Sequence, residues 1–327
     1  MKGQKMKDKR KILKIASLFE FIYVLISIFY YLSKGKINEE VIANSFLLLI
    51  NLLISIVIFK ESNKGLKDIN KSKIFISGFI LLLNSVIPGI LCFLYLILIK
   101  DKKEEQLPRK DKEIISTKEK IISIISVLLF IFIMFFLPKL YIGEKLPKFL
   151  MYVFLFLIVL IPNFNILKND FLLLIKNKNK YFRFILRRYI IMLIVMIIIA
   201  IPIILLNKGN ISTNQKMINI MFKKNAFITI LLSCVYAPFT EEGIFRLSLS
   251  KIINNRTLFI IISGFLFGLM HMIDKFTSFY DLLYIFQYAS LGVCLAKAYT
   301  DSNNIFVPIS MHFIQNFLAS LLVILFY

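Results

Sequence analysis

Uninterrupted apolar runs, each long enough to cross a lipid bilayer, recur along the whole 327-residue chain. A helix of about 20 apolar residues spans the roughly 30 Å hydrocarbon core of a membrane. With 58% hydrophobic residues and a mean hydropathy of +0.79, a soluble fold could not bury its apolar side chains. The sequence therefore predicts an all-α, polytopic transmembrane helical bundle, whose apolar segments are 13–33, 41–59, 74–99, 121–137, 149–167, 188–206, 226–250, 257–273, 280–298 and 305–326.

The net charge of +22 comes from 41 Lys and Arg against 19 Asp and Glu. The basic residues lie mainly between apolar runs, where the positive-inside rule and anionic lipid headgroups account for them. No basic stretch is interleaved with aromatic residues in a polar domain, so a nucleic-acid partner is not expected. We predict a multi-pass protein of the cell membrane with a cytoplasmic N-terminus and cytoplasmic links at 60–73, 100–120 and 168–187.

One apolar segment conflicts with this topology. A simple crossing by 74–99 would place the basic link 100–120 outside the cell, against the positive-inside rule. Asn84, Pro88 and Gly89 lie in the middle of the segment, where they disfavour a continuous helix. We therefore predict a re-entrant hairpin that turns near Pro88 and returns to the cytoplasm.

The charged link is also the best internal boundary. It divides the chain into an accessory membrane module (1–100), a charged cytoplasmic linker (101–120) and a working membrane core (121–327). All three cysteines lie inside apolar runs without a CxxC pair, so neither a disulfide framework nor a cysteine metal site is expected.

Ionisable side chains inside spans are costly and usually mark function. Three pairs in the last third of the chain are each four residues apart: Glu242 with Arg246, Phe267 with His271, and His312 with Asn316. On a helix this spacing places both members on one face. Glu241 precedes the first pair, and the chain's only 2 histidines occupy the other two pairs.

The depth of these residues supports a common site. Counted along the expected spans, Glu241, His271 and His312 lie about 15, 22 and 20 Å from the cytoplasmic side. Because imidazole changes its proton occupancy near neutral pH, such a cluster favours a chemical role. The other polar residues in apolar runs, Glu20, Asn51, Asn84 and Asn163, have no partner at a matching spacing and are expected to be structural.

The three pairs resemble the EExxxR, FxxxH and HxxxN motifs of the CAAX-protease and bacteriocin-processing (CPBP) family of intramembrane endopeptidases, which includes the Ras-converting enzymes. They occur in the family's order, and the resemblance covers about 226–320. It implies a conical catalytic core of helices that cleaves a peptide bond of a membrane-associated peptide or protein, with roles in processing or bacteriocin self-immunity.

The resemblance also implies roles for single residues. Glu241 would be the general base that activates water, and His271 would help to hold that water. His312 and Asn316 would stabilise the oxyanion of the tetrahedral intermediate, while Glu242 would orient the site through Arg246. The expected partners are the lipid bilayer and a peptide or membrane-protein substrate, and no cofactor is expected.

Alternatives stay open at this point. Glu241, His271 and His312 could instead hold Zn²⁺, although no HExxH pattern is present. There is no GxSG around Ser263 for a serine protease and no GxGD for an aspartyl protease. A proton-coupled transporter could use the same ionisable residues as a relay, and a catalytically silent scaffold or immunity regulator of the same family could act by binding alone.

Overall fold

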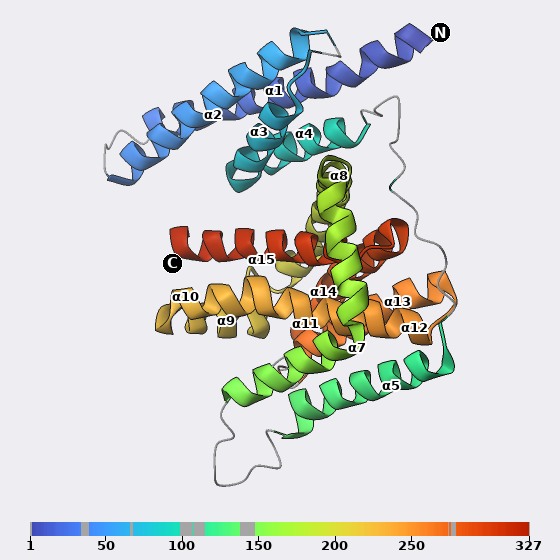
Figure 1. Cartoon of the computed structure of the whole chain (residues 1–327). Coiled ribbons are helices and arrows are strands. Elements are labelled where there is room, and N and C mark those ends of the chain that lie inside the picture. The colour runs from blue at the N-terminus through green and yellow to red at the C-terminus, as the bar shows by residue number, and fades with distance from the viewer. Residues whose placement is uncertain are drawn as a thin grey trace. The chain divides into compact units, whose positions relative to one another are not determined.

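The computed structural model describes residues 2–33, 39–65, 68–98, 107, 115–137, 148–273, 275 and 279–326. Within these ranges every regular element is a helix, which confirms the predicted all-α class (Figure 1). Labelled in chain order, the elements are α1 (Lys2–Ser33), α2 (Glu39–Asn63), α3 (Lys71–Asn84), α4 (Val86–Leu98), α5 (Thr117–Ile131), η1 (Phe132–Phe136), α7 (Lys148–Lys176), α8 (Lys178–Leu206), α9 (Thr213–Lys224), α10 (Ala226–Ile230), η2 (Leu231–Tyr236), α11 (Ala237–Glu242), η3 (Gly243–Ser248), α12 (Leu249–Ile252), α13 (Arg256–Met272), α14 (Phe279–Ser302) and α15 (Phe306–Phe326).

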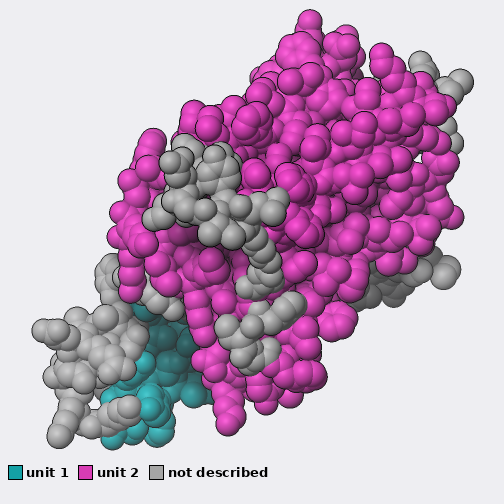
Figure 2. All heavy atoms as spheres, turned by 90° about the horizontal axis from the view of Figure 1, so that it is seen from below, with its two compact units in different colours: residues 1–104 teal, residues 105–327 magenta. Residues whose placement is uncertain are grey.

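The chain divides into two compact units, Met1–Glu104 and Glu105–Tyr327, which Figure 2 shows in different colours. Most of the predicted linker 101–120 lies outside the described residues. The candidate site residues all belong to the second unit, and each unit is described by itself below.

In the first unit, α1 packs against α2 and α4, and α3 packs against α4. The chain between α3 and α4 breaks at Ser85, whose φ of −133° and ψ of 81° are not helical. A Cβ atom added at Gly78 of α3 would lie 2.9 Å from Cys92 Cβ of α4, so the two helices form a tight hairpin. The hairpin thus turns at Ser85, slightly before the predicted Pro88, because Pro is well tolerated in the first turn of the following helix. Its return to the same side of the membrane stays a prediction.

Seven helices of the described part are long and apolar enough to cross a membrane: Arg10–Tyr31, Thr117–Phe136, Phe149–Lys176, Lys178–Leu206, Ala226–Ile252, Phe279–Ser302 and Phe306–Ile324. Their outer surfaces are apolar, since large side chains such as Ile161, Leu205 and Phe227 are 70%, 73% and 77% exposed. This pattern suits lipid and would not suit water. The protein is a multi-pass membrane protein.

The predicted basic link 168–187 is not a loop. Helix α7 continues to Lys176, and α8 begins at Lys178, with only Asn177 between them. Lys and Arg are good helix formers and can extend their charged ends toward water, so the helices continue beyond the apolar runs. The prediction of a link was therefore wrong about its structure.

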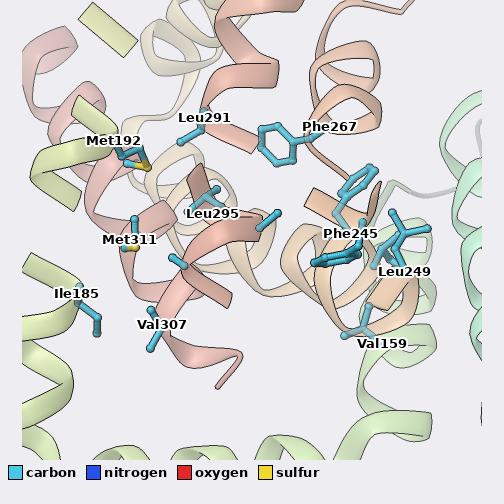
Figure 3. Packing of buried hydrophobic residues seen from close by; sticks show 14 of the residues in the cluster. Val159, Ile185, Met192, Phe245, Leu249, Phe267, Leu291, Leu295, Val307 and Met311 are labelled. Carbon is cyan, nitrogen blue, oxygen red and sulfur yellow. The ribbon is translucent and has the colours of Figure 1, made fainter. Parts of the chain in front are cut away.

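The core of the second unit joins helices that are distant in sequence. Its buried side chains include Val159 of α7, Met192 of α8, Phe267 of α13, Leu295 of α14 and Met311 of α15. Figure 3 shows these side chains together with Phe245 and Leu249 of the segment that carries the glutamates. The packing of this core fixes the positions of α13 and α15 against the helix of Glu241.

Close contact between α13 and α14 depends on glycine. A Cβ atom at Gly268 would lie 2.5 Å from the Ile285 carbonyl oxygen and 2.8 Å from the Ala289 nitrogen, both of which are backbone atoms. Gly264, one turn earlier, meets Val293 in the same way, so the pair forms a small-xxx-small contact. This contact sets the height of His271, which follows Gly268 on the same helix.

We expect Gly268→Ala to destabilise the protein by about 1–3 kcal/mol, because the two backbones must separate. The displaced α13 should also lower any activity that depends on His271. Thermal unfolding in detergent measures the first effect. Ile261→Ala on the lipid-facing side of α13, where the side chain is 56% exposed, is the control and should leave stability nearly unchanged.

Candidate active site

The two glutamates lie near the middle of one continuous helical segment, Ala226–Ile252, which contains two π-helical stretches. The first stretch, Leu231–Tyr236, directly precedes Pro238. Proline lacks an N–H and its ring clashes with the carbonyl four residues earlier, so the helix widens before it. The second stretch, Gly243–Ser248, follows Glu242 and contains Arg246. Such π-bulges are frequent at functional sites.

Glu242 and Arg246 form the ion pair that their spacing predicts. Arg246 Nε lies 2.8 Å from Glu242 Oε2, and both side chains are fully buried. Arg246 Nη1 also donates to Ser263 Oγ at 2.7 Å, and Ser263 Oγ donates to the Phe245 carbonyl at 2.6 Å. Ser263 is therefore a structural partner of the arginine. This network joins the glutamate helix to α13.

His312 of α15 binds the same glutamate from another side. Its Nδ1 lies 3.0 Å from Glu242 Oε1, and the histidine side chain is only 2% exposed. Glu242 therefore connects Arg246 on its own helix with His312 on a helix distant in sequence. Two cationic or hydrogen-bond-donating partners stabilise a buried carboxylate inside a membrane protein.

Glu241 and His271 form a second, more accessible pair. His271 Nε2 lies 3.8 Å from Glu241 Oε2, and the two side chains are 17% and 16% exposed. The distance is too long for a direct hydrogen bond. It is short enough for one water molecule to contact both atoms at about 2.8 Å. Glu241 Oε2 itself is buried, and within the described residues it has no hydrogen-bond partner.

The orientation of His271 follows from its neighbours. Its Nδ1 lies 2.9 Å from the Phe267 carbonyl oxygen, which can only accept, so Nδ1 carries a hydrogen. In the neutral ring Nε2 is then an acceptor that faces Glu241. The ring is held between Phe267, with centroids 4.4 Å apart, and Tyr288 of α14, which stacks at 4.8 Å and 16°.

Phe267 explains the first position of the predicted FxxxH pair. Its side chain is fully buried, and its ring contacts His271, His312 at 5.5 Å and the Arg246 guanidinium at 5.2 Å. An apolar ring at this place separates the site from the rest of the core. It also strengthens the electrostatic interactions around it, because it excludes water.

Asn316 lies one turn beyond His312 on α15, but the described contacts do not join it to either glutamate. Its Nδ2 donates to the Ser233 carbonyl at 2.7 Å, in the first π-helical stretch. An amide nitrogen has two hydrogens, so one donor is used for this contact and one is left.

Polar groups of α9 and the segment after α13 lie near the more accessible pair. Lys275 Nζ donates to Asn214 Oδ1 at 2.6 Å, and Asn214 Nδ2 donates to the Tyr288 hydroxyl at 3.1 Å. Burial lowers the pKa of Lys275, and the nearby carboxylate of Glu241 acts in the opposite direction. These contacts hold the ring that stacks on His271.

Zinc binding by Glu241, His271 and His312 stays a hypothesis. Within the described ranges, no three His, Cys, Asp or Glu side chains are placed to share one metal ion. His312 Nδ1 is occupied by its contact with Glu242.

Part of the chain is similar to a known protein family. Residues 223–318 match the family model described as Type II CAAX prenyl endopeptidase Rce1-like. The match covers less than a third of the chain, and it shows that this segment is similar to that family. The Rce1-like family is a protease family, so the segment that contains both glutamates and both histidines is related to peptidases. No curated protein and no solved structure matches the chain.

Two contributors to the site in the Rce1-like segment were not predicted from the sequence. The sequence draws attention to Ser263 only as a possible serine nucleophile, and it does not point to Tyr288. Ser263, Phe267 and His271 recur at intervals of four residues, so the face of α13 was a signal for Ser263. Tyr288 lies on another helix, and no spacing in the sequence connects it with His271.

Proposed function

We propose that the second unit hydrolyses a peptide bond of a membrane-associated peptide or protein, with Glu241 as the general base. The observation that carries this proposal is the division of the two glutamates. Glu242 is fully buried and paired with Arg246 and His312, whereas Glu241 is partly exposed and faces an acceptor nitrogen of His271. One carboxylate supports the site and the other can meet water and substrate.

The reaction follows from these positions. Glu241 takes a proton from a water molecule that His271 Nε2 also orients, and the water oxygen attacks the carbonyl carbon of the substrate. The carbonyl oxygen becomes an oxyanion. Glu241 then gives the proton to the amide nitrogen, the carbon–nitrogen bond breaks, and a carboxylic acid and an amine leave the site.

The oxyanion is stabilised by His312 and the remaining hydrogen of Asn316 Nδ2. When Nδ1 of His312 donates to Glu242, Nε2 can donate only if the ring is an imidazolium. The carboxylates of Glu241 and Glu242 would face the charges of that ring and of Arg246, and Lys275 also lies near Glu241.

The proposal is tested by incubating the purified protein with a library of membrane-associated peptides and reading new termini by mass spectrometry. Cleavage at defined bonds is expected, and it should survive a strong chelator because no metal takes part. Activity that is lost in chelator and restored by zinc would contradict the metal-free mechanism. A folded protein that cleaves no peptide would favour the scaffold or the transporter.

We expect His312→Ala to lower kcat roughly 10²–10³-fold with little change in KM, the effect of losing one oxyanion donor. Gln315→Ala is the matched control on α15. It also removes a hydrogen-bonded side chain, but the partner of Gln315 is Tyr189 and not a residue of the proposed mechanism. Steady-state kinetics on one cleaved peptide separate kcat from KM. Equal kinetics for the His312 variant and the control would exclude His312 from the oxyanion site.

We further propose that the protein resides in the cell membrane with its N-terminus in the cytoplasm. The basic residues around 168–187 and the N-terminal segment support this orientation. Labelling of single cysteines with a membrane-impermeant reagent tests it. A cysteine at Glu104 that reacts from outside the cell would contradict both this orientation and the predicted re-entrant hairpin.

A further inference from the structure

The first unit buries a carboxyl group that the proposed hydrolysis does not use. Glu20 of α1 is 0% exposed, and its Oε1 accepts a hydrogen bond from Ser85 Oγ at 3.1 Å. Its Oε2 is also buried and has no hydrogen-bond partner within the described residues. The sequence predicted only a structural role for Glu20.

Ser85 reaches Glu20 because the helix is broken at this residue. Its backbone lies between the end of α3 and the start of α4. Interrupted helices at membrane depth are tolerated where protein groups or a polar site satisfy the freed backbone. In transporters such breaks commonly line ion sites.

The contacts between α1 and α2 indicate that Asn51 of α2 lies at the same height along this helix pair as Glu20. Helices α1 and α2 are in register through Ser17 and Ser55, whose hydroxyl groups each donate to the other residue's carbonyl at 3.1 and 2.9 Å. Glu20 and Asn51 lie one turn further along the same faces of this antiparallel pair. Asn51 is 1% exposed, and its buried Oδ1 also has no hydrogen-bond partner in the described part of the chain.

Among the described residues, no basic side chain is close enough to influence Glu20. Ser85, between α3 and α4, donates to Glu20, and the buried Cys92 thiol of α4 lies near it. Ser17, Asn51 and Ser55 are the buried polar residues on the adjoining turns of α1 and α2. No ion pair joins Glu20 to a basic residue among those that the structure describes. An ionised carboxylate buried in this way would be strongly unfavourable. Because one carboxylate neutralises one positive charge, a cation bound here would be monovalent.

We propose that Glu20, Asn51 and Ser85 form a binding site for a small monovalent cation, either a hydrogen ion or an alkali-metal ion. The cation joins the two acceptor oxygens, Glu20 Oε2 and Asn51 Oδ1, that have no donor among the described residues. A hydrogen ion on Oε2 would donate to the asparagine, and an alkali-metal ion would be coordinated by both oxygens. The site is independent of the proposed hydrolysis in the second unit.

The test follows the unfolding temperature of the full-length protein in detergent under two titrations. One raises the pH from about 6 to about 9 in N-methylglucamine chloride, a range above the ordinary pKa of glutamate. The other replaces N-methylglucamine with sodium or potassium at constant pH and ionic strength. A hydrogen ion predicts that Tm falls as pH rises, and an alkali-metal ion predicts that Tm rises in sodium or potassium.

Glu20→Gln should abolish whichever response the wild type shows, because the amide cannot bind either cation. Glu61→Gln is the matched control: Glu61 is also buried, but its two oxygens already accept from Lys64 and the Asn70 nitrogen. If Glu20→Gln does not fold, Asn51→Leu is the second variant. It should shift the midpoint of the response at least about tenfold in cation concentration, because losing one hydrogen bond to a charged group weakens binding by about that factor. A wild type that responds to neither titration, or a Glu20→Gln protein that responds like the wild type, would overturn the proposal.

Discussion

Replacing Glu241 with glutamine should lower the rate of peptide cleavage roughly 10²–10⁴-fold while leaving the fold intact. Glutamine has nearly the same shape, but its amide cannot take a proton from water. Because Glu241 Oε2 accepts no hydrogen bond from the described residues, the substitution breaks no hydrogen bond of that oxygen to them. The expected result is a loss of kcat with an unchanged unfolding temperature.

The control for this variant is another glutamate-to-glutamine change far from the site. Glu119 closes the capping box of α5 with Ser116, a position at which glutamine serves equally well. Glu119→Gln should therefore keep both activity and stability. A Glu241→Gln protein that cleaves as fast as the Glu119→Gln protein would exclude Glu241 as the general base.

Replacing Arg246 with methionine should destabilise the protein by about 3–5 kcal/mol, the usual cost of removing one partner of a buried ion pair. Arg246 is fully buried, and it also donates to Ser263. Its removal leaves the Glu242 carboxylate with His312 as its remaining partner. The expected result is a large loss of folded protein, measured by thermal unfolding or by the yield of monodisperse protein.

A double variant distinguishes this explanation from a simple loss of packing. Glu242→Gln with Arg246→Met removes the unpaired charge together with its partner, so much of the lost stability should return. Cleavage should stay low, because His312 then lacks the carboxylate that positions it. If the double variant were no more stable than Arg246→Met alone, the buried charge would not be the cause.

The sequence predicted contacts within one helix better than contacts between helices. Spacings of four residues placed Glu242 with Arg246 correctly, because a single helix fixes their geometry. The contact between Glu242 and His312 crosses 70 residues of sequence, and only the shared depth of their spans pointed to it. The contribution of Tyr288 depends on how α14 packs against α13, which local spacing does not encode.

Hydropathy alone does not predict where the helices begin and end. It marks where lipid is, whereas hydrogen bonding and helix propensity decide where a helix ends. The basic stretch 168–187 was therefore predicted as a link although it is helical apart from a turn at Asn177. Amphipathic α9 lies between the apolar segments 188–206 and 226–250, where hydropathy alone predicts no helix. Glu20 and Asn51 had no partner at helical spacing, and their relation became visible only through the register of α1 and α2.

The most direct test of the central claim is peptide cleavage in water enriched in oxygen-18, with wild-type protein and Glu241→Gln protein side by side. The substrate is a peptide that the library has shown to be cleaved, and the products are read by mass spectrometry. Hydrolysis by activated water predicts that the wild type places one heavy oxygen in the new carboxyl group and that the variant gives almost no product. Labelled product formed equally fast by both proteins, or product without the label, would contradict the account.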